Sequence, residues 1–210
     1  MVMNPAIKGD RVLEPTEPWE TWAVFAYNSV VHVGPGENRM YYDCIEGSGV
    51  PPGMSQAQAH AGDISHRRIC LATSADGKTW IKPNLGIFNY SGSTANNILL
   101  EDSGNGVFID LNPKAPPSQK WKMVCSNAVY ASPDGLHWTK MTASSPVKAE
   151  DDTKPTGYFD PALGKYVISV RRDVGGRKIG RCVTSDFTRW ESEVPGGSGC
   201  PVVLGTRSAE

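Results

Sequence analysis

The 210-residue chain lacks the features that mark several large classes of protein. Its formal net charge is −1, so it has no overall basic field that would attract nucleic acid or an acidic membrane. No stretch approaches the roughly eighteen apolar residues of a membrane-spanning helix, and residues 1–20 lack the apolar run of a signal peptide. We therefore expect neither a nucleic-acid partner nor a membrane partner, and the cellular compartment stays open.

Cysteine is also scarce, with five residues that are scattered and form no CxxC pair. This spacing gives no support to a zinc site or a redox motif, and no cofactor is expected. Four of the cysteines lie in apolar runs typical of strands, which favours buried, inert thiols over disulfides. They are Cys44, Cys70, Cys125 and Cys182.

What the chain does contain is a threefold repeat of a β-rich run, a turn and a tryptophan. The copies end at Trp80, Trp138 and Trp190, which are 58 residues apart (80 to 138) and then 52 residues apart (138 to 190). The Asp-Gly pairs at 76–77 and 134–135 suit tight hairpins, because glycine accepts positive φ. Phe187 replaces glycine in the third copy, so the sequence predicts a different turn there.

A period near fifty residues, with several short strands in each unit, is typical of a β-propeller. Each unit has three runs of about four to eight residues rich in Val, Ile, Tyr and Phe, and a fourth run follows the tryptophan. The sequence therefore predicts an all-β fold with about three four-stranded antiparallel blades of an expected five. The aspartates of the repeated turns are assigned to architecture, and the tryptophans are expected to pack between neighbouring blades.

The predicted boundaries follow the repeat. Residues 1–28 form a lead-in, 29–105 blade one, 106–155 blade two, 156–193 blade three, and 194–210 a tail or the start of a next blade. Three blades should not close, so we expect further blades or an oligomer to cover the open edges.

Blade one carries an insertion, 45–67, that is rich in Gly, Pro, Ser and Ala. It contains His60, Asp63 and His66 at three-residue spacing. A composition of this kind is more typical of a solvated loop than of a metal site, so no metal is predicted.

Several stretches between about Pro18 and Glu193 are shared with a known superfamily. They are Arg68–Trp80 with Lys82–Gly86, Tyr90–Ser93, Asn96–Ile98, Val107–Asp110, Asn112–Pro113, Phe159–Pro161 and Gly164–Tyr166. In these stretches the chain resembles the five-bladed propeller glycosidases of families 32, 43, 62 and 68, and most closely the branch called "glycosyl hydrolase family 32-like".

That resemblance implies catalysis by acidic side chains that project into a central funnel from the inner strands. Glycosidic cleavage requires them because the leaving oxygen is protonated while an oxocarbenium-like charge is stabilised. The positions that match are Asp110 in blade two and Asp160 in blade three. The Arg-Asp-Pro of the family is Ile109-Asp110-Leu111 here, and Asp160 stands where the family carries Glu.

Blade one departs from the family pattern, because the Asn-Asp-Pro-Asn-Gly nucleophile motif has no match. Its inner strand carries Asn28, which could bind sugar but cannot act as a base. A third carboxylate would then come from Asp43, Asp152 or Glu20. The residues assigned to substrate binding are Asn28, Asp152 and Arg171, the last because Arg171 or its neighbour Arg172 should point toward the funnel.

Three hypotheses for function remain open. The leading one is a glycoside hydrolase-like propeller that acts on an oligosaccharide or polysaccharide through Asp110 and Asp160. The alternative is a carbohydrate-binding or degenerate propeller without catalysis, favoured by the missing acid of blade one. A sialidase-type propeller is the third, since Ser74–Trp80 is similar to an Asp-box, although it is one residue shorter between Asp and Gly.

Overall fold

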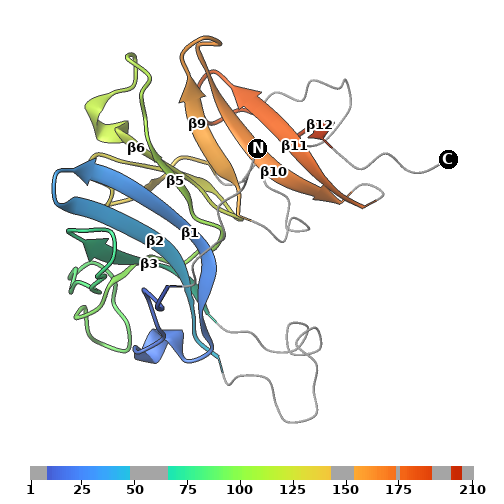
Figure 1. The fold of residues 1–210 in the computed structure, drawn as a ribbon. Helices are drawn as coiled ribbons and strands as arrows, with labels where there is room; N and C mark the ends of the chain where they lie inside the picture. Colours follow the sequence, from blue (N-terminus) through green and yellow to red (C-terminus); the bar gives the residue numbers. More distant parts are fainter. Residues whose placement is uncertain (1–8, 48–65, 143–153, 174–175, 191–199, 205–210) are drawn as a thin grey trace.

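The computed structural model describes residues 9–47, 66–142, 154–173, 176–190 and 200–204. Within these ranges the chain forms three four-stranded antiparallel sheets, ordered β1-β2-β3-β4, β5-β6-β7-β8 and β9-β10-β11-β12 (Figure 1). This all-β arrangement of three consecutive blades confirms the predicted fold class. None of the described helices has the length and hydropathy needed to cross a bilayer.

Each sheet is built from strands that follow one another in the sequence. The first contains β1 (Ala23–Gly34), β2 (Glu37–Ile45), β3 (Arg67–Ser74) and β4 (Ile98–Leu100). The second contains β5 (Gly106–Ile109), β6 (Trp121–Val124), β7 (Val129–Ser132) and β8 (Thr139–Lys140). The third contains β9 (Thr156–Asp160), β10 (Lys165–Asp173), β11 (Arg177–Thr184) and β12 (Val202–Leu204). Two short 3-10 helices, η1 (Pro18–Glu20) and η2 (Pro117–Gln119), complete the described elements.

The first strand of each sheet is the inner one, and the three inner strands lie side by side. Ser29 of β1 donates its hydroxyl to the carbonyl of Asn105 at 2.6 Å and accepts the N–H of Val107 at 2.9 Å. Gly157 of β9 lies directly against the ring of Phe108 in β5, where an added Cβ would come within 2.9 Å. These contacts set β1, β5 and β9 next to one another around a common centre.

The blades share two ends, which we name by the course of the inner strands. At the turn end the inner strands finish, and the third strand of each sheet leads into its Ser/Thr-Asp turn. In the first sheet, for example, Ser74 at the end of β3 pairs with Asn38, which lies beside the β1–β2 hairpin. At the strand-start end the inner strands begin and β2, β6 and β10 finish. In Figure 1 the β1–β2 hairpin lies at the left edge and the β9–β10 hairpin at the top, both at the turn end.

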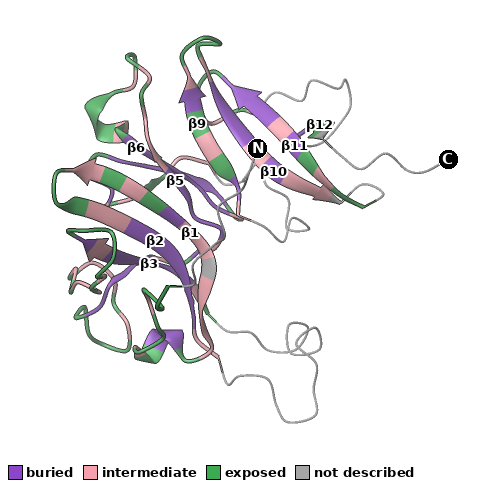
Figure 2. Ribbon diagram, viewed as in Figure 1, coloured by how far each residue is buried: buried purple, intermediate pink, exposed green. Residues whose placement is uncertain are grey.

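The buried residues lie mainly on the strands (Figure 2), and apolar side chains form clusters between neighbouring sheets. One cluster joins the first two sheets and includes Tyr41, Trp121 and the half-buried Trp138. A second joins the last two sheets and includes Phe187 and Trp190. Two of the three repeated tryptophans therefore pack between neighbouring blades, as the sequence predicts, whereas Trp80 packs in a third cluster within the first sheet.

The three repeated turns share one geometry. A hydroxyl of Ser74, Ser132 or Thr184 lies 3.0, 3.0 or 3.1 Å from the carboxylate of the aspartate two residues later. The same carboxylate accepts the N–H groups of the residues two and three positions later, for example Lys78 and Thr79 at 2.8 Å each from Asp76. The expectation that the third turn differs is wrong, since Phe187 has φ 63°, close to the 73° of its glycine counterpart in the first turn.

The neighbouring blade explains why phenylalanine stands in this strained position. An added Cβ on Gly135 would come within 2.6 Å of the Tyr41 hydroxyl, so only glycine fits the second turn. In the third turn Phe187 is fully buried, and its ring packs edge-on against Phe108 of the preceding blade with the ring centroids 5.8 Å apart. Packing between blades thus compensates the conformational cost of a positive φ angle in a residue that has a Cβ atom.

The expectation of inert thiols is corrected by strand pairing. Cys44 and Cys70 form a disulfide, as do Cys182 and Cys200, and Cys125 is buried and belongs to neither of these two bonds. The antiparallel register places the first pair on adjacent strands, a proximity that sequence spacing alone does not reveal.

The boundaries of two sheets also differ from the expected ones. The apolar run Val202–Leu204, expected in a tail or at the start of a next blade, is β12, which pairs with β11 as the outer strand of the third sheet. The first sheet begins earlier than expected, because β1 starts at Ala23 and not at residue 29.

Candidate functional site

Asp110 follows β5 at the turn end, and its carboxylate is enclosed between the second and third sheets. Its side chain is fully buried, although the residue as a whole is half-buried. The carboxylate accepts the hydroxyl of Tyr166 at 2.7 Å and the N–H of Asn112 at 2.8 Å. The ammonium of Lys122, itself 1% exposed, lies 3.5 Å away and sits over the rings of Tyr166 and Phe187. The ion pair with Lys122 therefore lies within the second blade, and the hydrogen bond from Tyr166 links Asp110 to the third blade.

Burial changes the acid–base properties of the groups around Asp110. It lowers the pKa of Lys122, while the charge of Asp110 acts in the opposite direction. It raises the pKa of Tyr166, and the hydrogen bond to Asp110 adds to this effect. Tyr166 therefore keeps its proton and remains a donor to the carboxylate.

Asp160 is the last residue of β9 and also lies at the turn end. One of its carboxylate oxygens accepts the N–H groups of Ala162 and Leu163 at 2.9 and 3.1 Å. This is the hydrogen-bond pattern of an aspartate that caps a tight turn. The described contacts therefore give Asp160 a task in the β9–β10 hairpin, and none of them joins it to Asp110.

The strand-start end holds a different kind of aspartate. Asp43 lies near the end of β2 and is 1% exposed. Its two oxygens accept the N–H of Gly104 at 3.0 Å and the side-chain amide of Asn105 at 2.5 Å. Burial raises the pKa of Asp43 to about 6, against the lowering effect of these two donors.

Asn28, assigned to substrate binding, lies at this same end on β1. Its backbone carbonyl accepts a hydrogen bond from the ammonium of Lys154, which directly precedes the third blade. Burial lowers the pKa of Lys154, while the charge of Asp43 raises it. Lys154 thus spans from the third blade to the first, and it brings Asn28 and Asp43 into one neighbourhood. The sequence reasoning missed Lys154, although it stands just before an inner strand, as Asn105 does in blade two.

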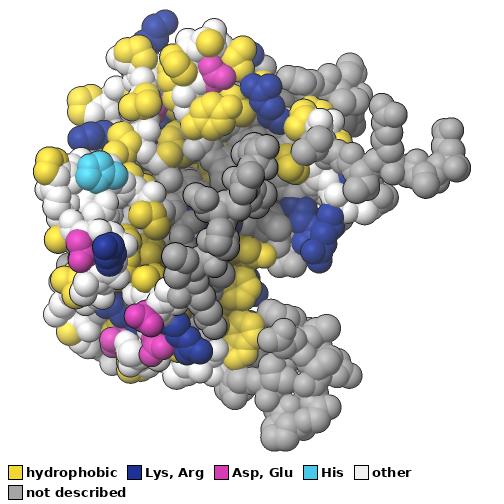
Figure 3. Space-filling model, viewed as in Figure 1, with side chains coloured by type: hydrophobic (Ala, Val, Ile, Leu, Met, Phe, Trp, Pro, Cys, Tyr) yellow, Lys and Arg dark blue, Asp and Glu magenta, His cyan; other side chains and the backbone are white. Residues whose placement is uncertain are grey.

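Lys154 also lines a cavity of about 340 Å³ at the strand-start end of the third sheet. Arg171, also assigned to substrate binding, lines the same cavity, together with Arg177 and Lys178. Figure 3 shows Lys and Arg side chains gathered where β10 and β11 meet at this end. The structure therefore brings Asn28 and Arg171 to one end of the blades, opposite Asp110 and Asp160.

The remaining candidates fall elsewhere. Asp152, His60 and Asp63 lie outside the described residues, and the described residues contain no group of His, Cys, Asp and Glu suited to a metal ion. Glu20 is fully buried, where it accepts the hydroxyl of Tyr42 at 2.7 Å and pairs with Lys82. It therefore anchors η1 to the first sheet.

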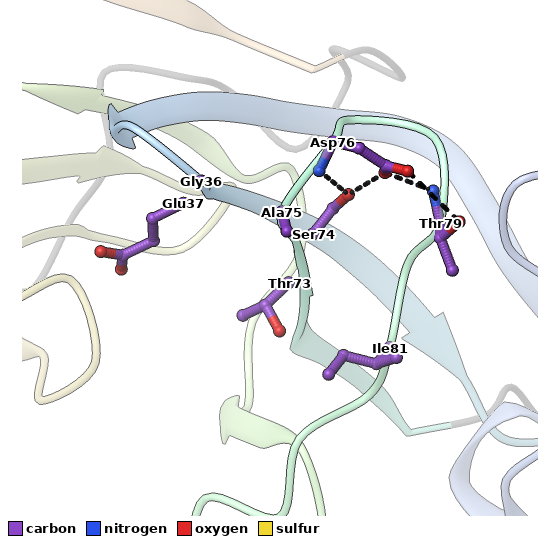
Figure 4. Close-up of a pocket in the computed structure, with 8 residues that line it drawn as sticks. All are labelled: Gly36, Glu37, Thr73, Ser74, Ala75, Asp76, Thr79 and Ile81. Atoms are coloured by element: carbon purple, nitrogen blue, oxygen red, sulfur yellow. Dashed lines mark hydrogen bonds between the residues drawn. The ribbon is translucent and has the colours of Figure 1, made fainter.

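A second hollow of about 570 Å³ lies at the turn end of the first sheet (Figure 4). It contains two carboxylates, but that of Glu37 points away from Asp76 and pairs with Arg39 at 2.7 Å. The N–H groups of Thr79 and Lys78 lower the pKa of Asp76 to about 2. An aspartate that stays ionised cannot act as a proton donor near neutral pH, so these two groups do not form an acid–base pair.

Comparison with solved structures places the fold among glycoside hydrolases. A glycosyl hydrolase from Bacteroides ovatus matches with a TM-score of 0.60 and 15% identity, over 93% of this chain and 59% of its own length. A complex of BT0996 with RGII matches with a TM-score of 0.56 and 13% identity, over 94% of this chain and 62% of its own length. Another structure, described as a glycoside hydrolase, gives the same four values.

These likenesses show the fold alone, because the sequences are only distantly similar. The chain spans about three fifths of the length of the structures it matches. No protein-family model matches the chain, and no curated protein does. The fold is thus that of propeller glycoside hydrolases over part of a propeller, while the narrower likeness to families 32, 43, 62 and 68 stays a prediction.

Proposed function

We propose that this chain is the propeller part of a glycoside hydrolase-type protein that holds an oligosaccharide at the strand-start end. The observation that carries the proposal is Lys154, which reaches from the third blade to the Asn28 carbonyl in the first and also lines the 340 Å³ cavity. A glycan bound there would contact the third sheet and would lie beside the hydrogen bond by which Lys154 reaches the first blade. The likeness of the fold to glycoside hydrolases supports a carbohydrate as the ligand.

If the chain is catalytic, Asp43 is the carboxylate best suited to proton transfer among those described at this end. Its pKa of about 6 lies close to neutral pH, where a general acid is most effective. Asp110 and Asp160 remain the acids suggested by the family resemblance. Their contacts favour structural roles, because the carboxylate of Asp110 is buried against Lys122 and that of Asp160 caps a turn.

Glycan binding without catalysis is the second candidate. It is favoured by the lining of the cavity at Lys154, in which the described residues include no carboxylate. Most glycosidases need two carboxyl groups, one on each side of the scissile bond.

The test is a turnover and binding assay on the 210-residue chain with a panel of oligosaccharides. Turnover that is lost in Asp43→Asn and kept in Asp110→Asn and Asp160→Asn would assign the acid to Asp43, and the reverse pattern would assign it to the turn end. Thermal unfolding of each variant separates loss of chemistry from loss of fold. Binding without product would support the second candidate, and absence of binding to every glycan would overturn the proposal.

A further inference from the structure

The inner strand of the first sheet is irregular where it passes Asp43. The pairs of β1 with β2 on either side of this irregularity are Val24 with Cys44 and Asn28 with Tyr42. Three residues of β1, 25–27, therefore stand opposite Asp43 alone, and we call this segment the β1 bulge. A bulge bends its strand and changes the direction of side chains, and bulges are common beside active sites.

The β1 bulge carries two aromatic side chains that are partly exposed. Phe25 and Tyr27 are both half-buried. Their rings meet edge to face, with the centroids 4.9 Å apart and an angle of 75° between the planes. The Phe25 ring is not among the side chains that build the three apolar clusters of the described residues. The pair therefore forms an angled apolar surface outside the cores that join the blades.

Segments that lead into the next two blades hold the bulge in place. The side-chain amide of Asn105, which is fully buried, donates to the backbone carbonyl of Tyr27 at 3.0 Å. Lys154 donates to the carbonyl of Asn28, the residue that follows the bulge. Residues just before the second and third inner strands thus bind two consecutive carbonyls of the first. The bulge is therefore fixed where the three blades meet.

Asn105 also joins the bulge to Asp43. The same amide nitrogen that binds the Tyr27 carbonyl donates to the Asp43 carboxylate at 2.5 Å. The backbone of the bulge and the carboxylate are thus only two hydrogen bonds apart. A group that packs against the aromatic pair would lie near the acid that the proposed function assigns to proton transfer.

The chemistry of the aromatic pair suits a sugar ring. A pyranose ring presents C–H groups on its face and hydroxyl groups around its edge. Aromatic side chains offer a large apolar surface at a low cost in conformational entropy, and ligand pockets commonly combine such surfaces with a few polar groups. Here the polar groups beside the rings are the Asp43 carboxylate and the amide of Asn105.

We propose that the β1 bulge is the surface on which the glycan is seated, with the rings of Phe25 and Tyr27 packed against the C–H face of one sugar ring beside Asp43. The contact is apolar, so it recognises the ring face of a neutral sugar and not a charge. This inference rests on the proposed function, and it adds the part of the glycan that is recognised and the side chains that recognise it.

The experiment is a calorimetric titration of the 210-residue chain with neutral oligosaccharides of glucose, galactose and mannose. We expect at least one of them to bind, with an affinity that changes less than about twofold as salt is raised, because no charge on the ligand takes part.

The variants keep an apolar side chain but remove the planar ring. Phe25→Leu and Tyr27→Leu should each weaken binding about tenfold, whereas Tyr27→Phe keeps the ring and should stay within about twofold of wild type. Tyr158→Leu is the matched control, because Tyr158 is a 48% exposed tyrosine on another inner strand, β9, outside the bulge. It should leave the affinity unchanged. Thermal unfolding shows that each variant is folded at the temperature of the titration.

A second measurement needs no substitution. In the wild-type chain with the bound oligosaccharide, nuclear Overhauser effects should connect the assigned ring protons of Phe25 and Tyr27 with C–H protons of one sugar. This decides the question even if a leucine variant does not fold.

The outcomes separate this inference from the proposed function. Binding that is unchanged in both leucine variants, or sugar protons that contact neither ring, would overturn the role of the β1 bulge and leave the proposed function intact. An equal loss in Tyr158→Leu would also contradict it, because the effect would not be specific to the bulge. Failure of every oligosaccharide to bind the wild-type chain would overturn the proposed function itself.

Discussion

The two ends of the blades use aspartate in opposite ways. At the turn end Asp76 and Asp186 cap turns, and the N–H groups around them lower the pKa of each to about 2, in Asp186 against the raising effect of burial. At the strand-start end Asp43 is buried with two donors only, and burial raises its pKa to about 6. The number of donors relative to the degree of burial decides which aspartates stay ionised and which can exchange a proton.

The same contrast holds for the basic residues. Lys122 is enclosed against Asp110 between the second and third sheets. Arg171 and Arg177, in contrast, line an open cavity. The described part of the turn end therefore contains a completed ion pair within the second blade, whereas basic side chains line a cavity at the strand-start end. Four measurements test this difference between the two ends.

The largest effect is expected for Phe187→Ala at the turn end. It would leave a cavity between the second and third sheets, and the free energy of unfolding should fall by about 3–5 kcal/mol. Chemical denaturation measures this loss. Leu111→Ala is the control, because Leu111 is 73% exposed and its truncation should change stability by less than about 0.5 kcal/mol. A small effect of Phe187→Ala would mean that packing does not hold these two blades together.

Replacing Cys44 and Cys70 with serine would test the bracing of the strand-start end. The disulfide closes a separation of 26 residues, and its loss should lower the free energy of unfolding by about 3 kcal/mol. Thermal unfolding with and without reductant checks this. The double variant should be insensitive to reduction of this bond, so that any remaining shift reports on Cys182–Cys200. An unchanged melting temperature in both would contradict the pairing.

The raised pKa of Asp43 predicts a pH dependence of stability. Since the folded state binds this proton more tightly than the unfolded state, the contribution is present below pH 3.8 and is lost as pH rises through about 6. Between pH 4 and 7 the loss from this group should reach up to about 3 kcal/mol. The difference in unfolding free energy between wild type and Asp43→Asn, measured across this range, isolates it. A difference that is constant with pH would show that Asp43 has an ordinary pKa.

The smallest effect distinguishes the two aspartates at the turn end. Asp110→Asn removes the negative charge beside buried Lys122 and should cost about 2 kcal/mol. Asp160→Asn keeps an oxygen that can accept the N–H groups of Ala162 and Leu163, and it should cost less than about 0.5 kcal/mol. Denaturant titration of both variants compares them directly. Equal costs would place Asp160 in an ion pair that its contacts do not indicate.

Much of the architecture could be predicted from the repeated tryptophans and from the short β-rich runs between turns. Both signals are local, because a strand and its turn are encoded within about ten residues. These local signals could not explain why the second turn carries a small residue, Gly135, where the third carries a large one, Phe187. Each residue packs against a side chain of the preceding blade, Gly135 against Tyr41 and Phe187 against Phe108.

The candidate site was predicted less well, and the reason is the direction of the strands. Asp110 and Asp160 were chosen from motifs beside the inner strands, yet both come at the close of a strand. Asn28, Asp43 and Lys154 meet at the other end, although 126 residues separate Asn28 from Lys154. Which charged residues share an end follows from antiparallel pairing and from the packing of blades around a centre.

The all-β fold, the repetition of its units and the structural role of the aspartates in the repeated turns follow from local patterns of residues. The pairing of the cysteines, the burial of Asp43 with its raised pKa, and the cavity lined by four basic residues follow from the packing of the blades. Turn and strand preferences act between near neighbours in the sequence. Burial and electrostatic interactions depend on distances between blades, which the order of residues does not contain.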